Sequence, residues 1–213
     1  ETNIVTNLIQ FMKRQDKKNL AKYFSNSILI DGDTASFERG FSNYSVFYEP
    51  KINKMSGRGK YLLFPLNEYV PYIYEHIFRM FIDGEDLNKY IYNHTYTPQK
   101  FIGSYQFKDF KIGTLICSEI ISFQTINSLR KTNPNLVIYQ SHLSVFHNNP
   151  WFVMQQRSFS KVAAAQLRTP FIGVSDGAPS FIISPYGKIQ AVTNTGLSAN
   201  IYTIYKDKII ITK

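Results

Sequence analysis

Cysteine and tryptophan are scarce in this sequence, with one of each among 213 residues. A single cysteine excludes an internal disulfide framework and a cysteine-rich metal site. The four histidines form no metal-ligand pair such as H-x-x-x-H, and we therefore expect no metal and no other cofactor. No run of 18 apolar residues occurs, so the sequence predicts no membrane-spanning helix within these residues.

The motifs of several common enzyme classes are also missing. The sequence has no G-x-S-x-G elbow, no P-loop and no G-x-G-x-x-G, which argues against serine hydrolases and nucleotide binding. The net charge of +9 suits an anionic partner, either nucleic acid or an anionic membrane surface. Because no recognition motif for nucleic acid accompanies this charge, we expect no nucleic-acid partner.

What remains is the composition of a globular protein, in which strand patterns alternate with helical periodicity and predict an α/β fold. Hairpin signals near the C-terminus add antiparallel strands, so we expect mixed sheets. The polar, tyrosine-rich segment at about 82–108 is typical of an inserted lid-like loop. Helices are expected at 4–24, 72–81, 120–129 and 150–167, strands at 27–31, 44–48, 110–116, 136–139, 169–175, 181–184, 189–192, 200–205 and 208–212, a turn at 31–33 and a loop at 51–60.

The only cysteine, Cys117, follows a short apolar run that predicts a buried strand of a parallel sheet. Open α/β sheets place their ligands at the carboxyl ends of such strands. A helix beginning here would also favour the thiolate through its N-terminal dipole. The alternative is that Cys117 is a small buried hydrophobic residue, as lone cysteines usually are.

A cysteine nucleophile also needs a base and a group that stabilises the oxyanion. His142 lies near the end of a predicted strand and could approach Cys117, although an ordinary hydrogen-bonded histidine is the simpler interpretation. The other candidates are carboxylates and a lysine. Lys60 precedes a short apolar segment, and Glu68 follows eight residues later between two prolines.

Several segments, taken in order, carry a family resemblance. Gly59–Pro71 (GKYLLFPLNEYVP) resembles the motif K-x-x-L-V-P-F-G-E-[YF]-V-P, and Leu115–Ile120 (LICSEI) resembles I-C-Y-E-I. Glu1-Thr2-Asn3 resembles the tail of W-P-E-[TNS]-A, while 175–178 and 183–189 resemble T-N-N-G and I-G-P-x-G-x-I. These motifs are those of apolipoprotein N-acyltransferases, a branch of the nitrilase (carbon–nitrogen hydrolase) superfamily.

The resemblance implies a fold and a set of site residues. The fold would be a nitrilase-like four-layer α-β-β-α sandwich with mixed sheets over residues 1–213, its first strand and helix lying upstream of Glu1. Cys117 would be the nucleophile, Glu1 the general base and Lys60 the group that stabilises the oxyanion. The supporting residues would be Glu68, which orients the lysine or the substrate, Glu119 beside the nucleophile, and Ser118, whose backbone N–H would share the oxyanion.

The resemblance also implies a reaction. A fatty acyl group would pass from a phospholipid to a cysteine thioester and then to the N-terminal amine of a lipoprotein. The full-length protein would lie in the inner membrane, with this domain on the periplasmic side and against an anionic membrane surface. Ser118 stands where the family has tyrosine, and Gln140–Phe146 matches the family's N-D-A-W-F segment poorly.

Two other interpretations remain open. One is a soluble amidase or nitrilase, in which water replaces the amine as second nucleophile. The other is a catalytically degenerate nitrilase-like module that binds lipid or protein in a secretion or conjugation apparatus, since a fold does not fix a function. The aromatic residues of the predicted helix at 72–81 and the segment after it could touch acyl chains, but core packing explains them equally well.

Overall fold

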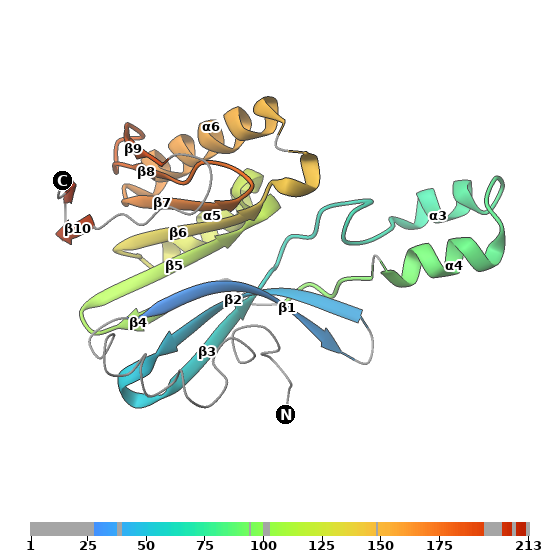
Figure 1. Cartoon of the computed structure of the whole chain (residues 1–213), viewed down its shortest axis with the longest axis horizontal. Coiled ribbons are helices and arrows are strands. Elements are labelled where there is room, and N and C mark those ends of the chain that lie inside the picture. Colours follow the sequence, from blue (N-terminus) through green and yellow to red (C-terminus); the bar gives the residue numbers. More distant parts are fainter. Residues whose placement is uncertain are drawn as a thin grey trace. The chain divides into compact units, whose positions relative to one another are not determined.

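The computed structural model describes residues 28–37, 40–93, 95–99, 103–147, 149–193, 202–205 and 208–211. They fall into two compact units, an N-terminal unit within Glu1–Phe101 and a C-terminal unit within Ile102–Lys213 (Figure 1). The expected helix at 4–24 and the predicted base Glu1 lie outside the described residues.

The N-terminal unit contains an antiparallel sheet in the order β1-β2-β3. Its elements are β1 (Leu29–Phe37), β2 (Gly40–Glu49), the 3-10 helix η1 (Pro50–Ile52) and β3 (Lys54–Gly59). Two sequence predictions are wrong here. The expected turn at 31–33 continues as strand because its backbone pairs with β2, and the expected loop at 51–60 contains β3, whose register with β2 satisfies its backbone groups.

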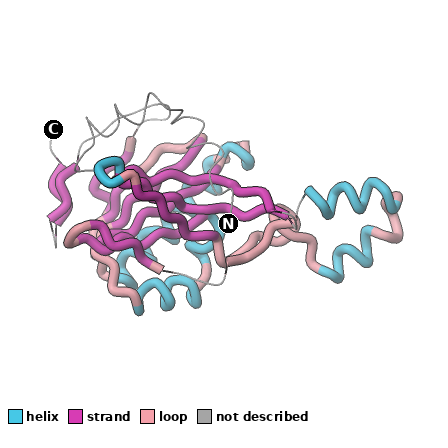
Figure 2. The backbone as a smooth tube through the Cα atoms, turned by 90° about the horizontal axis from the view of Figure 1, so that it is seen from below, coloured by secondary structure: helices cyan, strands magenta, loops and turns pink. Residues whose placement is uncertain are grey.

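Two helices form a hairpin in the same unit, α3 (Tyr72–Phe78) and α4 (Gly84–Asn93). Figures 1 and 2 both show them side by side, extended from the three-stranded sheet. An edge-to-face contact between Phe78 and Tyr90, with ring centroids 6.3 Å apart, joins the two helices. The predicted helix at 72–81 is thus confirmed over most of its length. The segment at 82–108 contains α4 and part of a sheet instead of being loop throughout, and its role as a lid stays a prediction. We call residues 72–93 the helical arm.

The C-terminal unit contains a six-stranded mixed sheet in the order β4-β5-β6-β7-β8-β9. The central strands β5, β6 and β7 are parallel, and the outer pairs are antiparallel, as the alternation of elements predicted. The strands are β4 (Ser104–Phe107), β5 (Phe110–Ile116), β6 (Leu136–His142), β7 (Phe171–Asp176), β8 (Phe181–Ile183) and β9 (Ile189–Val192), and a separate hairpin joins β10 (Tyr202–Tyr205) to β11 (Lys208–Ile211).

The helices of this unit begin at clear capping residues. The Oγ of Ser122 accepts from the backbone N–H of Thr125 at the start of α5 (Phe123–Lys131). Asn149 caps α6 (Pro150–Leu167), which also begins with a proline. The two helices connect the parallel strands, α5 between β5 and β6 and α6 between β6 and β7, and they contact each other. Such crossovers are almost always right-handed, which puts both helices on one face of the sheet. Two 3-10 helices complete the unit, η2 (Cys117–Ile121) and η3 (Ser144–Phe146).

The core of this unit lies between the parallel strands and their helices. Leu115, Val137 and Phe171 are fully buried on the three central strands. Packing is tight at Gly173, where an added Cβ would lie 2.1 Å from the ring of Phe181. Because the three central strands are parallel, their carboxyl ends share one edge of the sheet, and the chain leaves that edge at Cys117 after β5. No helix in the described part of the chain is both long and apolar enough to cross a membrane.

Candidate active site

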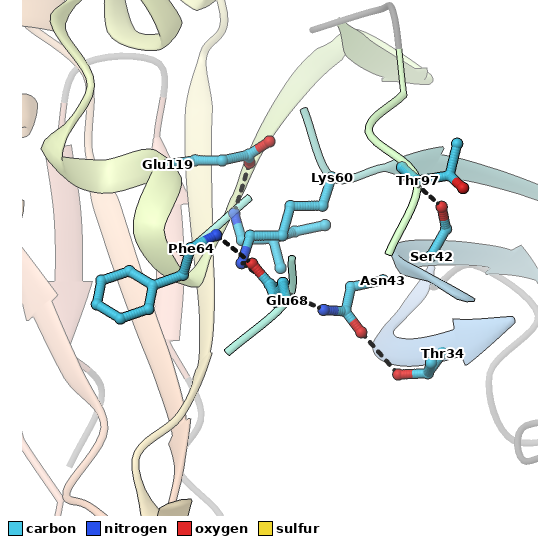
Figure 3. A network of polar contacts seen from close by, with 9 residues as sticks. Thr34, Ser42, Asn43, Lys60, Phe64, Glu68, Thr97 and Glu119 are labelled. Carbon is cyan, nitrogen blue, oxygen red and sulfur yellow. Dashed lines mark hydrogen bonds and ion pairs between the residues drawn. The ribbon is translucent and has the colours of Figure 1, made fainter. Parts of the chain in front are cut away.

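A buried ion pair joins Lys60 and Glu68 in the N-terminal unit (Figure 3). The Lys60 side chain begins just beyond β3, and its Nζ donates to both Glu68 oxygens at 2.6 Å. Lys60 is 1% exposed and Glu68 is 4% exposed, so water screens their charges little. Two further donors bind the Glu68 carboxylate. The Asn43 amide donates to Oε1 at 2.7 Å, and the Phe64 backbone N–H donates to Oε2 at 2.6 Å.

The loop that carries Glu68 is held in a non-helical shape, as its flanking prolines predicted. Leu66 adopts a left-handed φ of 65°, and its N–H donates to the carbonyl of Tyr69 at 2.7 Å. The Glu68 carbonyl then accepts from the N–H of Tyr96 at 2.8 Å. Burial raises the pKa of Tyr96 above its usual 10.0, and the negative charge of Glu68 raises it further. The loop therefore fixes the Glu68 carboxylate against the lysine.

Cys117 lies in the C-terminal unit, at the first residue after β5. Its φ is 49°, in the left-handed region that favours glycine. A non-glycine residue in this conformation costs free energy that the surrounding structure must supply, and such residues cluster at functional sites. The sequence predicted that the strand runs into a helix at 120–129. The structure instead has the 3-10 helix η2, and α5 begins only at Phe123.

Glu119 closes the turn around the cysteine. Its side chain is fully buried, and its Oε2 accepts a hydrogen bond at 2.8 Å from the backbone N–H of Ile116, the last residue of β5 (Figure 3). A carboxylate that accepts from a backbone N–H makes one of the stronger hydrogen bonds in proteins. Glu119 thus ties the end of β5 to η2, with Cys117 and the buried Ser118 between them.

A buried polar group lies beside this turn on β6 and α6. Tyr139 pairs in register with Leu115, two residues before the cysteine. Its hydroxyl bonds to the side chains of Gln156 and Ser141, and Gln156 Nε2 also donates to Ser141 Oγ. Burial raises the pKa of Tyr139, and the negative charges of Cys117 and Glu119 raise it further, against the lowering effect of the two hydrogen bonds.

His142 lies at the end of β6, on the edge where the sequence placed it. Its register partner on β7 is Asp176, and His142 Nε2 lies 3.4 Å from Asp176 Oδ2. Ser144 Oγ contacts both, bonding to the imidazole and donating to Asp176 Oδ2 at 3.3 Å. The side chains of His142 and Asp176 are mostly exposed, so this cluster contributes little stability. The three residues lie on the same sheet edge as the cysteine turn.

The predicted site residues thus fall into two groups. Lys60 and Glu68 contact each other in the N-terminal unit, and Cys117, Ser118 and Glu119 form one turn in the C-terminal unit. Their catalytic roles stay predictions, as does that of Glu1. Among the residues that the structure describes, no cluster of three or more histidine, cysteine, aspartate or glutamate side chains could hold a metal ion.

Sequence reasoning missed three polar residues of this region. Asn43 lies on β2 and reaches Glu68 through sheet register, which no local pattern signals. Tyr139 looks like an ordinary strand residue. Gln156 carried a usable signal, since it is a polar residue on the face of α6 that also contains the buried Ser160, Ala163, Ala164 and Leu167.

No protein-family model and no curated protein matches the sequence. Among solved structures, Nit3 from Saccharomyces cerevisiae, a member of branch 10 of the nitrilase superfamily, has a TM-score of 0.65 and 16% identity, covering 93% of this chain and 65% of its own. A CN-hydrolase superfamily protein from Xanthomonas campestris, with an arsenic adduct in its active site, has a TM-score of 0.60 and 10% identity, covering 94% and 68%. A mutant amidase from Nesterenkonia sp. AN1, with acrylamide added to its active-site cysteine, has a TM-score of 0.53 and 9% identity, covering 78% and 59%.

These likenesses define the class of fold. The chain has the α/β architecture with mixed sheets of nitrilase-superfamily structures, which confirms the predicted fold class. It spans about 65% of the length of Nit3. Similarity at this level of identity is similarity of fold, and the apolipoprotein N-acyltransferase branch stays a prediction.

Proposed function

We propose that this chain forms the catalytic part of a cysteine acyltransferase, which moves a fatty acyl group from a phospholipid through a thioester on Cys117 to an amine. The observation that carries the proposal is the backbone of Cys117. A left-handed φ of 49° at the carboxyl end of a central parallel strand places the half-buried Cys117 on a sharp turn. Serine hydrolases of α/β fold present their nucleophile on a turn of the same kind.

The proposed reaction has two steps. Cys117 Sγ attacks the ester carbonyl of the phospholipid while Glu1 takes the thiol proton, and a tetrahedral oxyanion forms. The C–O bond then breaks, Glu1 returns the proton to the leaving alcohol, and a lysophospholipid departs from the acyl-cysteine thioester. In the second step the amine attacks the thioester, its proton passes to Glu1, and the C–S bond breaks to release an amide and the thiolate, which regains the proton.

The Lys60–Glu68 pair supports a role for a fixed positive charge in these steps. A buried ion pair is weak evidence for stability, because desolvation offsets the attraction of its charges. A pair that adds little stability yet lies fully buried therefore favours a role in the chemistry. We propose that Lys60 stabilises the oxyanion together with the backbone N–H of Ser118, each such donor contributing about 3–4 kcal/mol to the transition state.

The helical arm supports a lipid substrate. None of the residues of α3 is buried, and the arm exposes many large apolar side chains, a feature typical of surfaces that meet membranes or partners. Phe81, at the turn between the helices, is the most exposed of them at 82%, followed by Tyr72 at 75% and Met80 at 71%. The exposed apolar residues of the arm are Tyr72, Ile73, Tyr74, Ile77, Met80, Phe81, Ile82, Tyr90 and Tyr92.

The finer parts of the proposal rest on the resemblance of the sequence motifs. They are a lipoprotein N-terminal amine as acceptor, an anionic membrane surface as the working environment, and a position on the periplasmic side of the inner membrane. A second function is also supported, since the amidase from Nesterenkonia sp. AN1 has this fold and an active-site cysteine. We infer that an amidase of this kind would use the same cysteine turn, with water as the second nucleophile.

One experiment separates these functions. The protein is incubated with phosphatidylethanolamine vesicles, and the acyl adduct is followed by mass spectrometry before and after a diacylglyceryl-cysteine peptide is added. An acyltransferase retains the adduct in water and loses it to the peptide as an amide. An amidase turns over small amides and loses any adduct to water at the same rate with or without peptide. A degenerate binding module forms no adduct.

A further inference from the structure

Asn43 touches both members of the buried ion pair from a single position on β2. Its backbone carbonyl accepts from the N–H of Lys60 at 2.7 Å, and its Nδ2 donates to Glu68 Oε1 at 2.7 Å (Figure 3). Its own Oδ1 accepts from Thr34 Oγ1 at 2.7 Å. The Glu68 carboxylate offers only acceptors, so the amide nitrogen must face it, and the amide oxygen is left to accept from the Thr34 hydroxyl.

The donors around Glu68 are evenly divided between its two oxygens. Oε1 accepts from Lys60 Nζ and the Asn43 amide, and Oε2 accepts from Lys60 Nζ and the backbone N–H of Phe64. A buried carboxylate needs such donors because it has lost its water. The backbone N–H of Phe64 belongs to the Glu68 loop, whereas Asn43 belongs to the sheet. Asn43 is therefore the donor that links the Glu68 loop to the sheet, next to the end of β3 where Lys60 follows.

We infer that Asn43 is the positioning residue of the Lys60–Glu68 pair: it holds the carboxylate at the angle that keeps the lysine ammonium at a fixed point in the site. This inference rests on the proposed function only for the catalytic role of Lys60. Without the Asn43 amide, Glu68 Oε1 keeps only the bond from Lys60 Nζ. We expect the carboxylate to rotate toward a replacement donor and to move the lysine ammonium with it. A displacement of about 1 Å in a catalytic group lowers rates by about 100-fold.

Two variants and a control test the inference. Asn43→Leu keeps the same number and branching of side-chain heavy atoms and removes the amide, while the backbone carbonyl that bonds Lys60 stays in place. Thr34→Val removes the hydroxyl that donates to the amide oxygen of Asn43, so its effects should run in the same direction and be smaller. Lys51→Ala changes an exposed residue of η1, outside this network, and should match the wild type.

The first readout needs no substrate. Acetic anhydride modifies accessible amines, and peptide mapping reports the rate of acetylation at Lys60. We expect that rate to rise at least about tenfold in Asn43→Leu, because an amine displaced from this buried ion pair becomes accessible to the reagent. Amide hydrogen exchange at Lys60, whose N–H bonds to the Asn43 carbonyl, should not change. Unchanged acetylation, or acetylation that rises only together with amide exchange, would overturn the inference.

The second readout is acylation of Cys117 by phospholipid. We expect Asn43→Leu to lower the acylation rate by about 100-fold with little change in the lipid concentration at half-maximal rate. Combined with Lys60→Met, it should add almost nothing, because residues that act as one unit are not additive. Wild-type acylation in Asn43→Leu, or full additivity, would contradict the inference. If the wild-type protein forms no adduct, the proposed function fails, and the acetylation readout alone decides the inference.

Discussion

The carboxylate of Glu119 accepts a hydrogen bond from the backbone N–H of Ile116 at 2.8 Å, and this bond spans the strained turn at Cys117. Both partners are buried, so water cannot replace the bond if it is lost. The geometry makes Glu119 a support for the backbone of the cysteine, independent of any contact with a substrate.

Replacing Glu119 with alanine should therefore lower the free energy of unfolding by about 1.5–3 kcal/mol, the range for a hydrogen bond to a charged group. Glu119→Gln keeps an acceptor oxygen of the same reach and should lose less. Urea denaturation measures both, and the rate of Cys117 alkylation by acrylamide reports the turn itself. An alanine variant with the stability and alkylation rate of the wild type would show that the bond does not hold the turn.

The Lys60–Glu68 pair predicts non-additive stability. Removing one partner leaves the other charge buried without compensation, so Glu68→Leu should cost about 3–5 kcal/mol. Lys60→Met combined with Glu68→Leu removes both charges and should be more stable than the single glutamate variant. The measurement is urea denaturation of Glu68→Leu, of Lys60→Met and of the double variant. Costs that simply add would mean that the two charges do not interact in the folded protein.

The sequence predicted those elements whose pattern is local. The strand at 110–116 and the helix at 150–167 have the predicted bounds, since a continuous apolar run marks the first and a proline followed by a periodic run marks the second. The strand β3 was missed because its composition (KMSGRG) lacks alternation, and its pairing with β2 decides its conformation. The turn expected at 31–33 failed for the same reason.

In the candidate site too, the sequence predicted local contacts and missed those set by tertiary pairing. Lys60 and Glu68 stand eight residues apart in one motif, so the sequence could suggest their association. Asn43 contacts them only because of the register of β2, which local sequence does not indicate. No residue pattern predicts the left-handed φ of Cys117, because glycine is the usual signal for that conformation. Contacts set by tertiary pairing therefore remained beyond local sequence reasoning.

Tyr139 predicts a loss of stability at alkaline pH. Burial raises its pKa in the folded state above the unfolded value near 10.0. The phenol thus contributes stability that is fully present below about pH 10 and is lost as the pH rises from there, because the unfolded state releases the proton first. Urea denaturation between pH 8 and pH 11 should show a steeper decline for the wild type than for Tyr139→Phe. Parallel declines would exclude Tyr139 as the cause.

The helical arm predicts binding to lipid vesicles. Replacing Met80 and Phe81 with serine should weaken binding at least about tenfold, since burying one large apolar side chain contributes about 1.5–3 kcal/mol. Tyr186→Ser, at a residue that is 89% exposed in the C-terminal unit, is the matched control and should bind as the wild type does. Vesicle flotation gives the measurement. Equal binding by the arm variant and the control would show that the arm does not contact the lipid.

The lipid composition of the vesicles gives a further distinction. The arm has four acidic and two basic residues, whereas the whole chain has a net charge of +9. Binding through the arm alone should therefore gain nothing from anionic lipid, and any gain must come from basic residues elsewhere in the chain. Comparing neutral with anionic vesicles for the wild type and the arm variant separates the two contributions.

Intact mass spectrometry of the protein after incubation with phosphatidylethanolamine vesicles tests the central claim most directly. The account predicts one added acyl group in the wild type, its removal by hydroxylamine as expected of a thioester, and its absence in Cys117→Ala. Circular dichroism of both proteins confirms that they are folded. An acyl group that persists in Cys117→Ala, or a folded wild-type protein that never acquires one, would contradict the assignment of Cys117 as the acyl-accepting nucleophile.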